Sequence, residues 1–484
     1  MQDVKTYIQS LFTAKGIVVS SNKSSLFEEF IVQQDSIDAV QRIIENQNSL
    51  MDKWKIKNRI ADILSQQIVI PNGTIGKPYL GLINFEKQNL TDLIFEQFEG
   101  LEELGLSFNK TNDCIEGIPN LSGDLKFTLL FKINGEDENE PLNRKVLQLV
   151  INPDPKSLWK DIPSDKTDKF WKEDDVSISD KIGEKNIVIS SKRGRSHKNV
   201  GSFRDDDFAF KHFTKSGWSI VAVSDGAGSY SLSRVGSQIA CNAVIDFFEN
   251  HADAEKSKEF EDKIISYNET SDQSILKEIE VLAKQNLYKA TVFVHNKIKA
   301  DAEETFKTSP ELFNNPKAKS YLDYYHATFI FALFKKYEFG YVILTFGVGD
   351  CPVAVMNLEQ TETTLLNWLD VGEFGGGTRF ITQSDIFHST EHPMATRFNF
   401  KIVPDFSYLF LMTDGIYDPK FVVEANLEKS EKWNEFMEDL KGKNEDNALV
   451  EFNPENTQIA EQLSKWMDFW SQGNHDDRTL AIVY

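Results

Sequence analysis

Cysteine is scarce in this sequence of 484 residues, and its three copies, Cys114, Cys241 and Cys351, are far apart. An odd number of cysteines, with no CxxC pair and no Cys/His spacing, argues against a disulfide framework and a structural zinc site. The chain also lacks a basic-then-apolar signal segment, and none of its apolar runs approaches the roughly 20 residues that span a bilayer. We therefore expect a cytoplasmic protein with no membrane partner.

Basic residues are also few relative to acidic ones. The sequence has 53 Lys and Arg against 75 Asp and Glu, which gives a formal net charge of −22. Because affinity for polyphosphates needs clustered cations, nucleic acid and anionic lipid are poor partners for this chain. Disorder is not expected, since 36 Phe and 8 Trp supply ample apolar surface for a core. Surplus carboxylates usually mean a solvated surface, and the alternative is that some of them bind divalent cations.

The first 153 residues fall into two segments that differ in composition and in hydrophobic pattern. Residues 1–66 are polar, with apolar residues at helical spacing between Val40 and Ile63, which predicts a helical segment. Residues 68–153 contain short β-type runs separated by Gly, Pro and Asn, which predicts a small all-β sandwich. The order NGTIGKPY, ELGLSF and IEGIPNLSGDLKFTLLF resembles the immunoglobulin-like modules found beside many bacterial enzyme domains. This resemblance implies a spacer or docking role.

The remaining residues divide into a connecting segment and a larger domain. Residues 154–185 are charged and rich in turn residues, which indicates a linker. In residues 186–484, β-type runs such as WSIVAVSDG and GYVILTFGVGD alternate with long helical stretches. Several of these strands follow one another without a helix between them. This order favours a layered, antiparallel α+β arrangement over a doubly wound parallel sheet.

Acidic residues recur where these apolar runs end or begin. They are Asp205, Asp206 and Asp207 in FRDDDFAF, Asp225 in VAVSDGAGS, Asp350 in FGVGD, Asp414 in LFLMTDG, and Asp476 and Asp477 in HDDRTLAIV. A strand end fixes the backbone while the next side chain reaches solvent, and carboxylate oxygens suit Mg²⁺ or Mn²⁺ better than zinc. Any one of them has a simpler explanation as a turn residue or a helix cap. Their recurrence favours a shared metal site.

Six motifs in this order resemble the protein phosphatase 2C (PPM-type) family. They are GRSHKNVGSFRDDDFAF, VSDGAGSYSLSRVGSQIA, YHATFIFALF, FGVGDCPVAVM, LFLMTDGIYD and GNHDDRTLAIVY, and the resemblance covers about 300 residues, 185–484. It implies a β-sandwich of two antiparallel sheets flanked by helices, with a two-metal site at one edge. It also implies hydrolysis of phosphoserine and phosphothreonine in proteins, opposite a Ser/Thr kinase, by direct attack of a metal-bridging hydroxide.

The resemblance assigns roles to individual residues. Asp225 would bridge two Mn²⁺ or Mg²⁺ ions, and the Gly226 carbonyl would bind one of them. Asp414 and Asp476 would complete the shell of the first ion. Asp205 and Asp206 would lie near the second ion. Asp207 is the alternative if the acidic motif is aligned one residue further along the chain. Asp350 occupies the position that helps to hold a weaker third ion in some members.

The sequence departs from the family pattern at two points. Many members have His after the Asp-Gly, as a proton donor to the leaving group, and this chain has Ala227. A metal-bound water or His197 would then be the donor. The arginine that binds phosphate is either Arg195 or Arg204, with Arg234 as a more distant candidate.

These departures leave other functions open. One alternative is a catalytically weak pseudophosphatase that binds a phosphoprotein or a kinase. Another is hydrolysis of a small phosphorylated metabolite.

Overall fold

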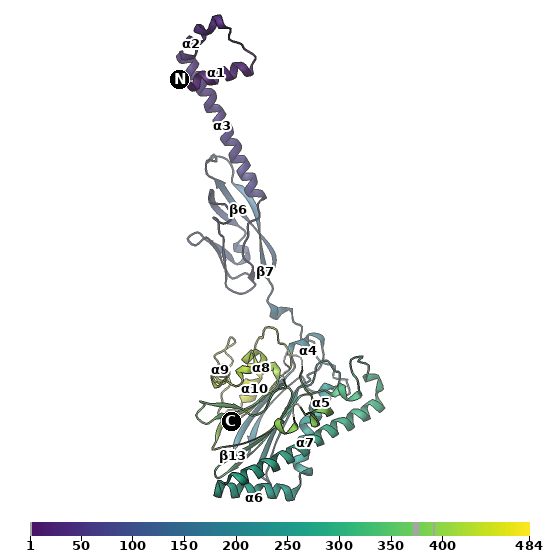
Figure 1. The fold of residues 1–484 in the computed structure, drawn as a ribbon. Coiled ribbons are helices and arrows are strands. Elements are labelled where there is room, and N and C mark those ends of the chain that lie inside the picture. Colours follow the sequence, from purple (N-terminus) through teal and green to yellow (C-terminus); the bar gives the residue numbers. More distant parts are fainter. Residues whose placement is uncertain (1, 371–376, 391–392) are drawn as a thin grey trace. The chain divides into compact units, whose positions relative to one another are not determined.

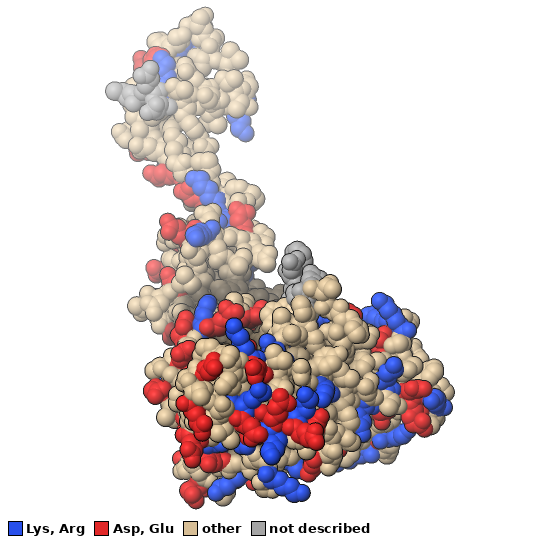
Figure 2. All heavy atoms as spheres, turned by 60° about the horizontal axis from the view of Figure 1, so that its bottom comes forward, with Lys and Arg blue, Asp and Glu red and all other residues tan. Residues whose placement is uncertain are grey.

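The computed structural model describes residues 2–370, 377–390 and 393–484. The chain divides into two compact units, Met1–Leu158 and Trp159–Tyr484 (Figure 1). Within the described part of the chain, no helix is both long enough and apolar enough to cross a membrane. Figure 2 shows acidic and basic side chains interspersed over the face of the second unit that it draws. On this face, exposed carboxylates therefore lie among exposed cations.

The first unit begins with helices and continues with two small sheets. Its helices are α1 (Gln2–Ala14), α2 (Ser24–Val32) and α3 (Gln34–Ser65). Its strands are β1 (Gly73–Thr74), β2 (Tyr79–Leu82), β3 (Leu93–Glu99), β4 (Leu106–Asn109), β5 (Cys114–Gly117), β6 (Gly123–Ile133) and β7 (Asn143–Asn152). They form the sheets β1-β7-β6-β3 and β2-β5-β4. The predicted N-terminal helical segment is therefore confirmed.

The end of α3 belongs to the core of the β module. Ile63 is fully buried and packs in one cluster with Phe131 and Leu149 from β6 and β7. The beginning of α3 contributes Val40 to a separate small core with α1 and α2. A single helix thus connects the two cores of this unit. The resemblance to immunoglobulin-like modules stays a prediction.

The second unit is a sandwich of two sheets in which every strand pair is antiparallel. The five-stranded sheet is β10 (Asp207–Phe213), β11 (Trp218–Ser224), β12 (Phe329–Tyr337), β13 (Gly340–Val348) and β16 (Phe398–Val403). The six-stranded sheet, in spatial order, is β15 (Thr363–Leu365), β14 (Val353–Asn357), β17 (Phe406–Met412), β18 (Arg478–Val483), β9 (Lys185–Lys192) and β8 (Asp175–Ile182).

Alternating side chains of each strand fill two different layers. In β11, Val221 and Val223 point into the core between the sheets, whereas Ile220 and Ala222 pack beneath helices. Helices α5 (Ser233–Asp246), α6 (Ala254–Thr270) and α7 (Gln273–Thr308) cover one sheet. Helices α8 (Asp414–Phe421), α9 (Ser430–Leu440) and α10 (Ile459–Trp466) cover the other (Figure 1). The predicted sandwich of two antiparallel sheets flanked by helices is confirmed.

The predicted linker at 154–185 differs from the structure. Residues from Trp159 onward belong to the second unit, and Asp175–Ile182 is the edge strand β8, paired along its length with β9. Most side chains of β8 are exposed or half-buried. Because most side chains of this edge strand are exposed to solvent, the strand lacks the apolar pattern of a buried strand. Its polar sequence therefore resembled that of a linker.

Candidate active site

The aspartates of the second unit meet because their strands end at the same edge of the sandwich. Asp225 directly follows β11, and Asp350 lies two residues after β13. Asp205 and Asp206 directly precede β10, whose first residue pairs with the last residue of β11. In the six-stranded sheet, the end of β17 and the start of β18 are likewise neighbours. Asp414, the first residue of α8, and Asp476 are attached there.

These carboxylates are close enough to repel one another. Burial raises the pKa of Asp225 well above its usual range, and Asp414, Asp206, Asp476 and Asp350 raise it further, in that order. Burial and the carboxylates of Asp350, Asp476 and Asp206 likewise raise the pKa of Asp414 well above normal. The structure therefore brings together five of the six aspartates that the family resemblance assigned to metal.

Two of these carboxylates have one oxygen fixed and the other unbound. Asp206 is fully buried, and its Oδ2 accepts hydrogen bonds from Thr413 Oγ1 at 2.8 Å and Thr479 Oγ1 at 2.7 Å. Asp350 Oδ2 accepts from Thr378 Oγ1 at 2.9 Å. The buried Oδ1 atoms of both aspartates have no hydrogen-bond partner among the described residues. Buried oxygens normally have partners, so a pair of them in an acidic cluster fits hard-cation ligands.

The surroundings of Asp225 also suit such a cation. The ligand atoms of Asp225, Asp350 and Cys351 lie within 4.8 Å of one another. Burial raises the pKa of the Cys351 thiol further above its already alkaline usual value, so this sulfur is a neutral thiol at pH 7 and the oxygens of Asp225 and Asp350 are the better ligands for a hard cation. At Gly226, a Cβ would lie 2.7 Å from the carbonyl oxygen of Asp205, so the close approach of the two loops requires glycine. The donor set fits Mn²⁺ or Mg²⁺ better than zinc.

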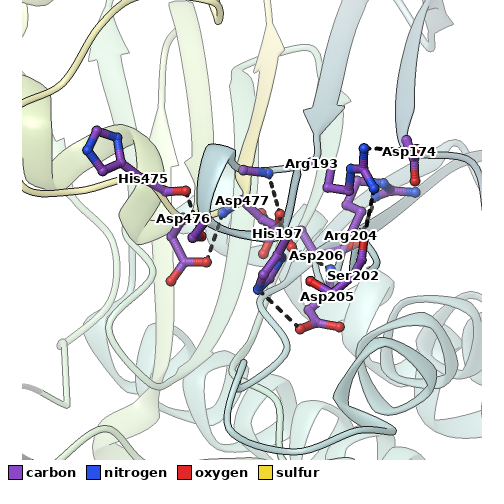
Figure 3. Close-up of polar contacts among 12 residues, drawn as sticks. Asp174, Arg193, His197, Ser202, Arg204, Asp205, Asp206, His475, Asp476 and Asp477 are labelled. Carbon is purple, nitrogen blue, oxygen red and sulfur yellow. Dashed lines mark hydrogen bonds and ion pairs between the residues drawn. The ribbon is translucent and has the colours of Figure 1, made fainter. Parts of the chain in front are cut away.

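His197 lies between two aspartates beside this cluster (Figure 3). It is on α4 (Arg195–Val200), with Nδ1 3.0 Å from Asp477 Oδ1 and Nε2 3.8 Å from Asp205 Oδ2. Burial opposes a positive charge on the imidazole, but Asp477 first, and then Asp205 and Asp476, outweigh it and raise the pKa of His197 to about 10. A Cβ at Gly228 would lie 3.5 Å from His197 Nε2, so the ring adjoins the Asp-Gly loop that carries Ala227.

Asp477 has a structural role that the sequence reasoning missed. Its two oxygens accept hydrogen bonds from the backbone N–H of Gly194 and of Asp205, both at 2.5 Å, in addition to the contact with His197. It therefore fixes the loop before β10 as well as the imidazole. The only hint of this role in the sequence is that Asp477 directly follows Asp476 in the motif HDDRT.

The predicted phosphate-binding arginines have other contacts. Arg195 donates from Nη1 to Phe469 O at 3.0 Å and from Nη2 to Asp468 O at 2.6 Å, and its guanidinium lies over Trp470. Arg204 is 3% exposed and donates to Ser191 Oγ, Asp206 O and Glu173 O. These contacts do not support a phosphate-binding role for either arginine.

The other cations near the acidic loop also have structural contacts. Arg234 donates to Phe170 O, Ser231 O and Asp168 Oδ1. Lys172, from the segment predicted as a linker, donates to Asp206 O at 2.7 Å and to Asp207 Oδ2 at 3.0 Å. The register alternative Asp207 is thus neutralised by a lysine, which favours Asp205 and Asp206 as the acidic pair of the site.

The chain is similar to a known protein family and to several solved structures. Residues 193–468 match the family model of protein phosphatase 2C. Similar solved structures include a bacterial serine phosphatase at 14% identity, covering 61% of this chain and 96% of that chain with a TM-score of 0.31. The catalytic domain of the serine threonine protein phosphatase PstP with two manganese ions has 14% identity, coverages of 61% and 96%, and a TM-score of 0.34.

A third similar structure is the serine/threonine phosphatase Stp1 from Staphylococcus aureus, at 13% identity, coverages of 66% and 98%, and a TM-score of 0.32. No curated protein sequence matches the chain. The family model, however, covers more than half of the sequence, and its range includes four of the five strand ends that carry the acidic cluster. The chain belongs to the protein phosphatase 2C family.

Proposed function

We propose that this chain is a metal-dependent phosphatase that hydrolyses phosphoserine and phosphothreonine in proteins. It would thereby reverse phosphorylation by a Ser/Thr kinase. One observation carries the proposal: mutually repelling, buried carboxylates whose free oxygens have no partner among the described residues. Such an arrangement is costly unless cations bind to it. The family membership supplies the reaction class.

The residues divide into two groups around the cations. Asp225, the Gly226 carbonyl, Asp414 and Asp476 would hold one ion, and Asp205 and Asp206 would lie beside the second. Asp350 would help to hold a third, weaker ion. When bound, Mn²⁺ or Mg²⁺ supplies Lewis acidity for the attacking water and positive charge for the phosphoryl oxygens. Thr413 and Thr479 orient Asp206 by fixing its Oδ2.

His197 is the proposed proton donor to the leaving serine or threonine oxygen. It lies beside the loop in which Ala227 replaces the usual histidine, and it approaches from α4 instead. Asp477 holds Nδ1, so Nε2 is the nitrogen directed to Asp205 and the loop. A donor that is oriented by a buried carboxylate is a common arrangement in acid–base catalysis.

The test is hydrolysis of a phosphothreonine peptide with and without Mn²⁺. Wild-type protein should need the metal, and Asp414→Asn should remove activity. Asp262→Asn, on the exposed side of α6, is the matched control and should keep it. Activity that survives Asp414→Asn would exclude this metal mechanism. A phosphorylated sugar as a parallel substrate tests the metabolite alternative.

A pseudophosphatase is the second candidate, and the arginine contacts favour it. Both predicted phosphate-binding arginines donate to groups of the protein itself. Calorimetric titration with Mn²⁺ distinguishes the candidates. Metal binding together with turnover supports the enzyme, whereas absence of binding at millimolar Mn²⁺ supports the binding module.

A further inference from the structure

A cavity of about 380 Å³ lies in the second unit, where α6 and α7 cover the five-stranded sheet (Figure 1). Its described lining comes from strands β10 to β13 and the turn between β10 and β11 on one side, and from α6, α7, Phe248 and Ala252 on the other. Trp218, at the start of β11, lines the cavity, whereas Asp225 follows the opposite end of that strand. The cavity is therefore separate from the candidate active site. Protein interiors are close-packed, so a space of this size is a candidate binding site.

The buried part of the lining is apolar. Leu287, Leu333 and Leu344 are buried and belong to the core cluster between the helices and the sheet. Phe248 lies on the π-helical turn Phe247–His251, which continues α5. Such turns are rare and often lie at functional sites. These side chains enclose a space that an apolar group can fill.

Glu261, on α6, is the one acidic side chain in the described lining, and its charge is compensated within the protein. Its carboxylate accepts hydrogen bonds from Lys335 Nζ at 2.8 Å, the Tyr337 hydroxyl at 2.8 Å and Trp218 Nε1 at 2.6 Å. The polar groups of these four side chains are thus bound to one another and are not available to a ligand. They form a wall that does not repel an anion.

Three hydrogen-bond donors of the lining are free. Lys215 and Lys258 are exposed, so they mark the opening of the cavity, and Asn286 on α7 is half-buried. Within the described part of the chain, none of these three side chains forms a hydrogen bond or an ion pair. Glu259, the sequence neighbour of Lys258, pairs with Lys256 instead. Two ammonium groups and an amide can therefore donate to one anionic group at the opening.

We propose that this cavity binds a small amphipathic carboxylate. The apolar body of the ligand would lie beside Leu333 and Leu344, and its carboxylate would lie at the opening, near Lys215 and Lys258. A mostly apolar lining with a few polar groups is typical of small-molecule pockets, whose volumes are about 300–1,000 Å³. An uncharged molecule would leave both lysines unused, and an organic cation would be repelled by them. The proposal does not depend on phosphatase activity.

The experiment measures binding to the full chain by titration calorimetry. The probe is octanoate, and its counterpart is octan-1-ol, which has the same chain without the charge. We expect octanoate to bind at one site, at least about 10-fold more tightly than octan-1-ol, because its headgroup accepts charge-assisted hydrogen bonds. The double variant Lys215→Glu, Lys258→Glu should weaken octanoate binding at least about 10-fold and change octan-1-ol binding by about twofold or less. Ala252→Trp fills the cavity and should remove binding of both probes.

Matched controls separate the cavity from the overall charge and stability of the protein. The variant Lys181→Glu, Lys299→Glu changes the net charge equally, at exposed positions of the second unit that do not line the cavity. It should bind octanoate within about twofold of wild type, because screened distant charges contribute little. Ala252→Ser changes the same position as the filling variant without occupying the space, and should keep binding.

Four results would overturn the proposal. They are equal losses in the two lysine variants, equal affinity for the two probes, unchanged binding in folded Ala252→Trp, and no binding of octanoate by wild-type protein. Thermal melting of each variant checks that it is folded. The lysine variants change exposed side chains only, so they keep the test decisive if Ala252→Trp does not fold. Failure of the phosphatase assay would leave these binding results unaffected, so the two proposals can fail separately.

Discussion

Two regions of the second unit bury aspartates in opposite ways. Asp370 is 4% exposed, and its carboxylate is fully engaged by the Arg397 guanidinium and by Gly349 N–H. Asp350, one residue beyond Gly349, has a buried oxygen with no partner among the described residues. Burial raises its pKa, and its nearest charged neighbours are other carboxylates. The first region is complete without a ligand, and the second is not.

This difference distinguishes an ion pair that stabilises the fold from the proposed metal site. A paired buried charge has its compensation within the chain, so its loss should affect stability. An unpaired carboxylate cluster lowers the stability of the metal-free chain, so removal of one member should increase that stability and abolish function.

The largest expected effect is on catalysis. Asp225→Asn should lower kcat/KM for a phosphothreonine peptide in Mn²⁺ by about 10⁴-fold, since Asp225 is a proposed ligand of the first metal ion. The same variant should raise the melting temperature in EDTA, because Asp414 and Asp206 lose a repelling neighbour. Steady-state kinetics and calorimetry measure the two effects. An Asn variant that is active, or less stable without metal, would contradict this account.

The opposite result is expected at the paired site. Asp370→Leu leaves the Arg397 guanidinium buried without its partner and should reduce the free energy of unfolding by about 3–5 kcal/mol. The double variant Asp370→Leu, Arg397→Met should recover at least about half of that loss, because no charge then stays buried alone. Urea denaturation measures both. A single variant as stable as the double one would show that the pair is not the source of the stability.

The sequence predicted the strand-end aspartates because their signal is local. An apolar run followed by Asp-Gly identifies Asp225 and Asp414 without any knowledge of the fold, and the family order adds Asp350 and Asp476. Antiparallel pairing of β10 with β11 and of β17 with β18 then brings them to one edge. Local pattern and topology were therefore sufficient to predict that these carboxylates lie together.

The contacts of the arginines could not be predicted in the same way. Arg195 is bound by the carbonyls of Asp468 and Phe469, and these acceptors lie more than 270 positions away in the sequence. Arg204 is bound by Ser191 and by Glu173 O, which lies in the segment mistaken for a linker. Backbone acceptors have no signature in side-chain sequence. Only the fold shows that these guanidinium groups already donate hydrogen bonds to other groups of the protein.

The next expected effect is on proton transfer. His197→Asn keeps a donor near Asp477 but removes Nε2, and should lower kcat for a phosphothreonine peptide by about 10²-fold. With p-nitrophenyl phosphate, whose leaving group needs no proton, the loss should be about threefold or less. Equal losses for the two substrates would indicate that His197 only positions the loop, and that another group donates the proton.

The smallest expected effect is the pH dependence of stability without metal. Burial first, and then Asp477, raise the pKa of both Asp205 and Asp206 to about 7, far above the value of about 4 in an unfolded chain. The folded state therefore binds more protons than the unfolded state between these values. Stability in EDTA should fall as the pH rises from about 4 to about 7, since unfolding then releases protons. Melting curves at several pH values measure this slope.

The contrast between the two regions decides how this slope responds to metal and mutation. Saturating Mn²⁺ should remove it, because bound cations keep the carboxylates ionised in the folded state as well. Asp206→Asn should reduce it, because one of the groups with a raised pKa is gone. Asp370→Asn should instead lower the stability itself, because it leaves the buried Arg397 guanidinium without an ionised partner. A slope that is unchanged in Asp206→Asn would mean that the carboxylate cluster is not the source of the pH dependence.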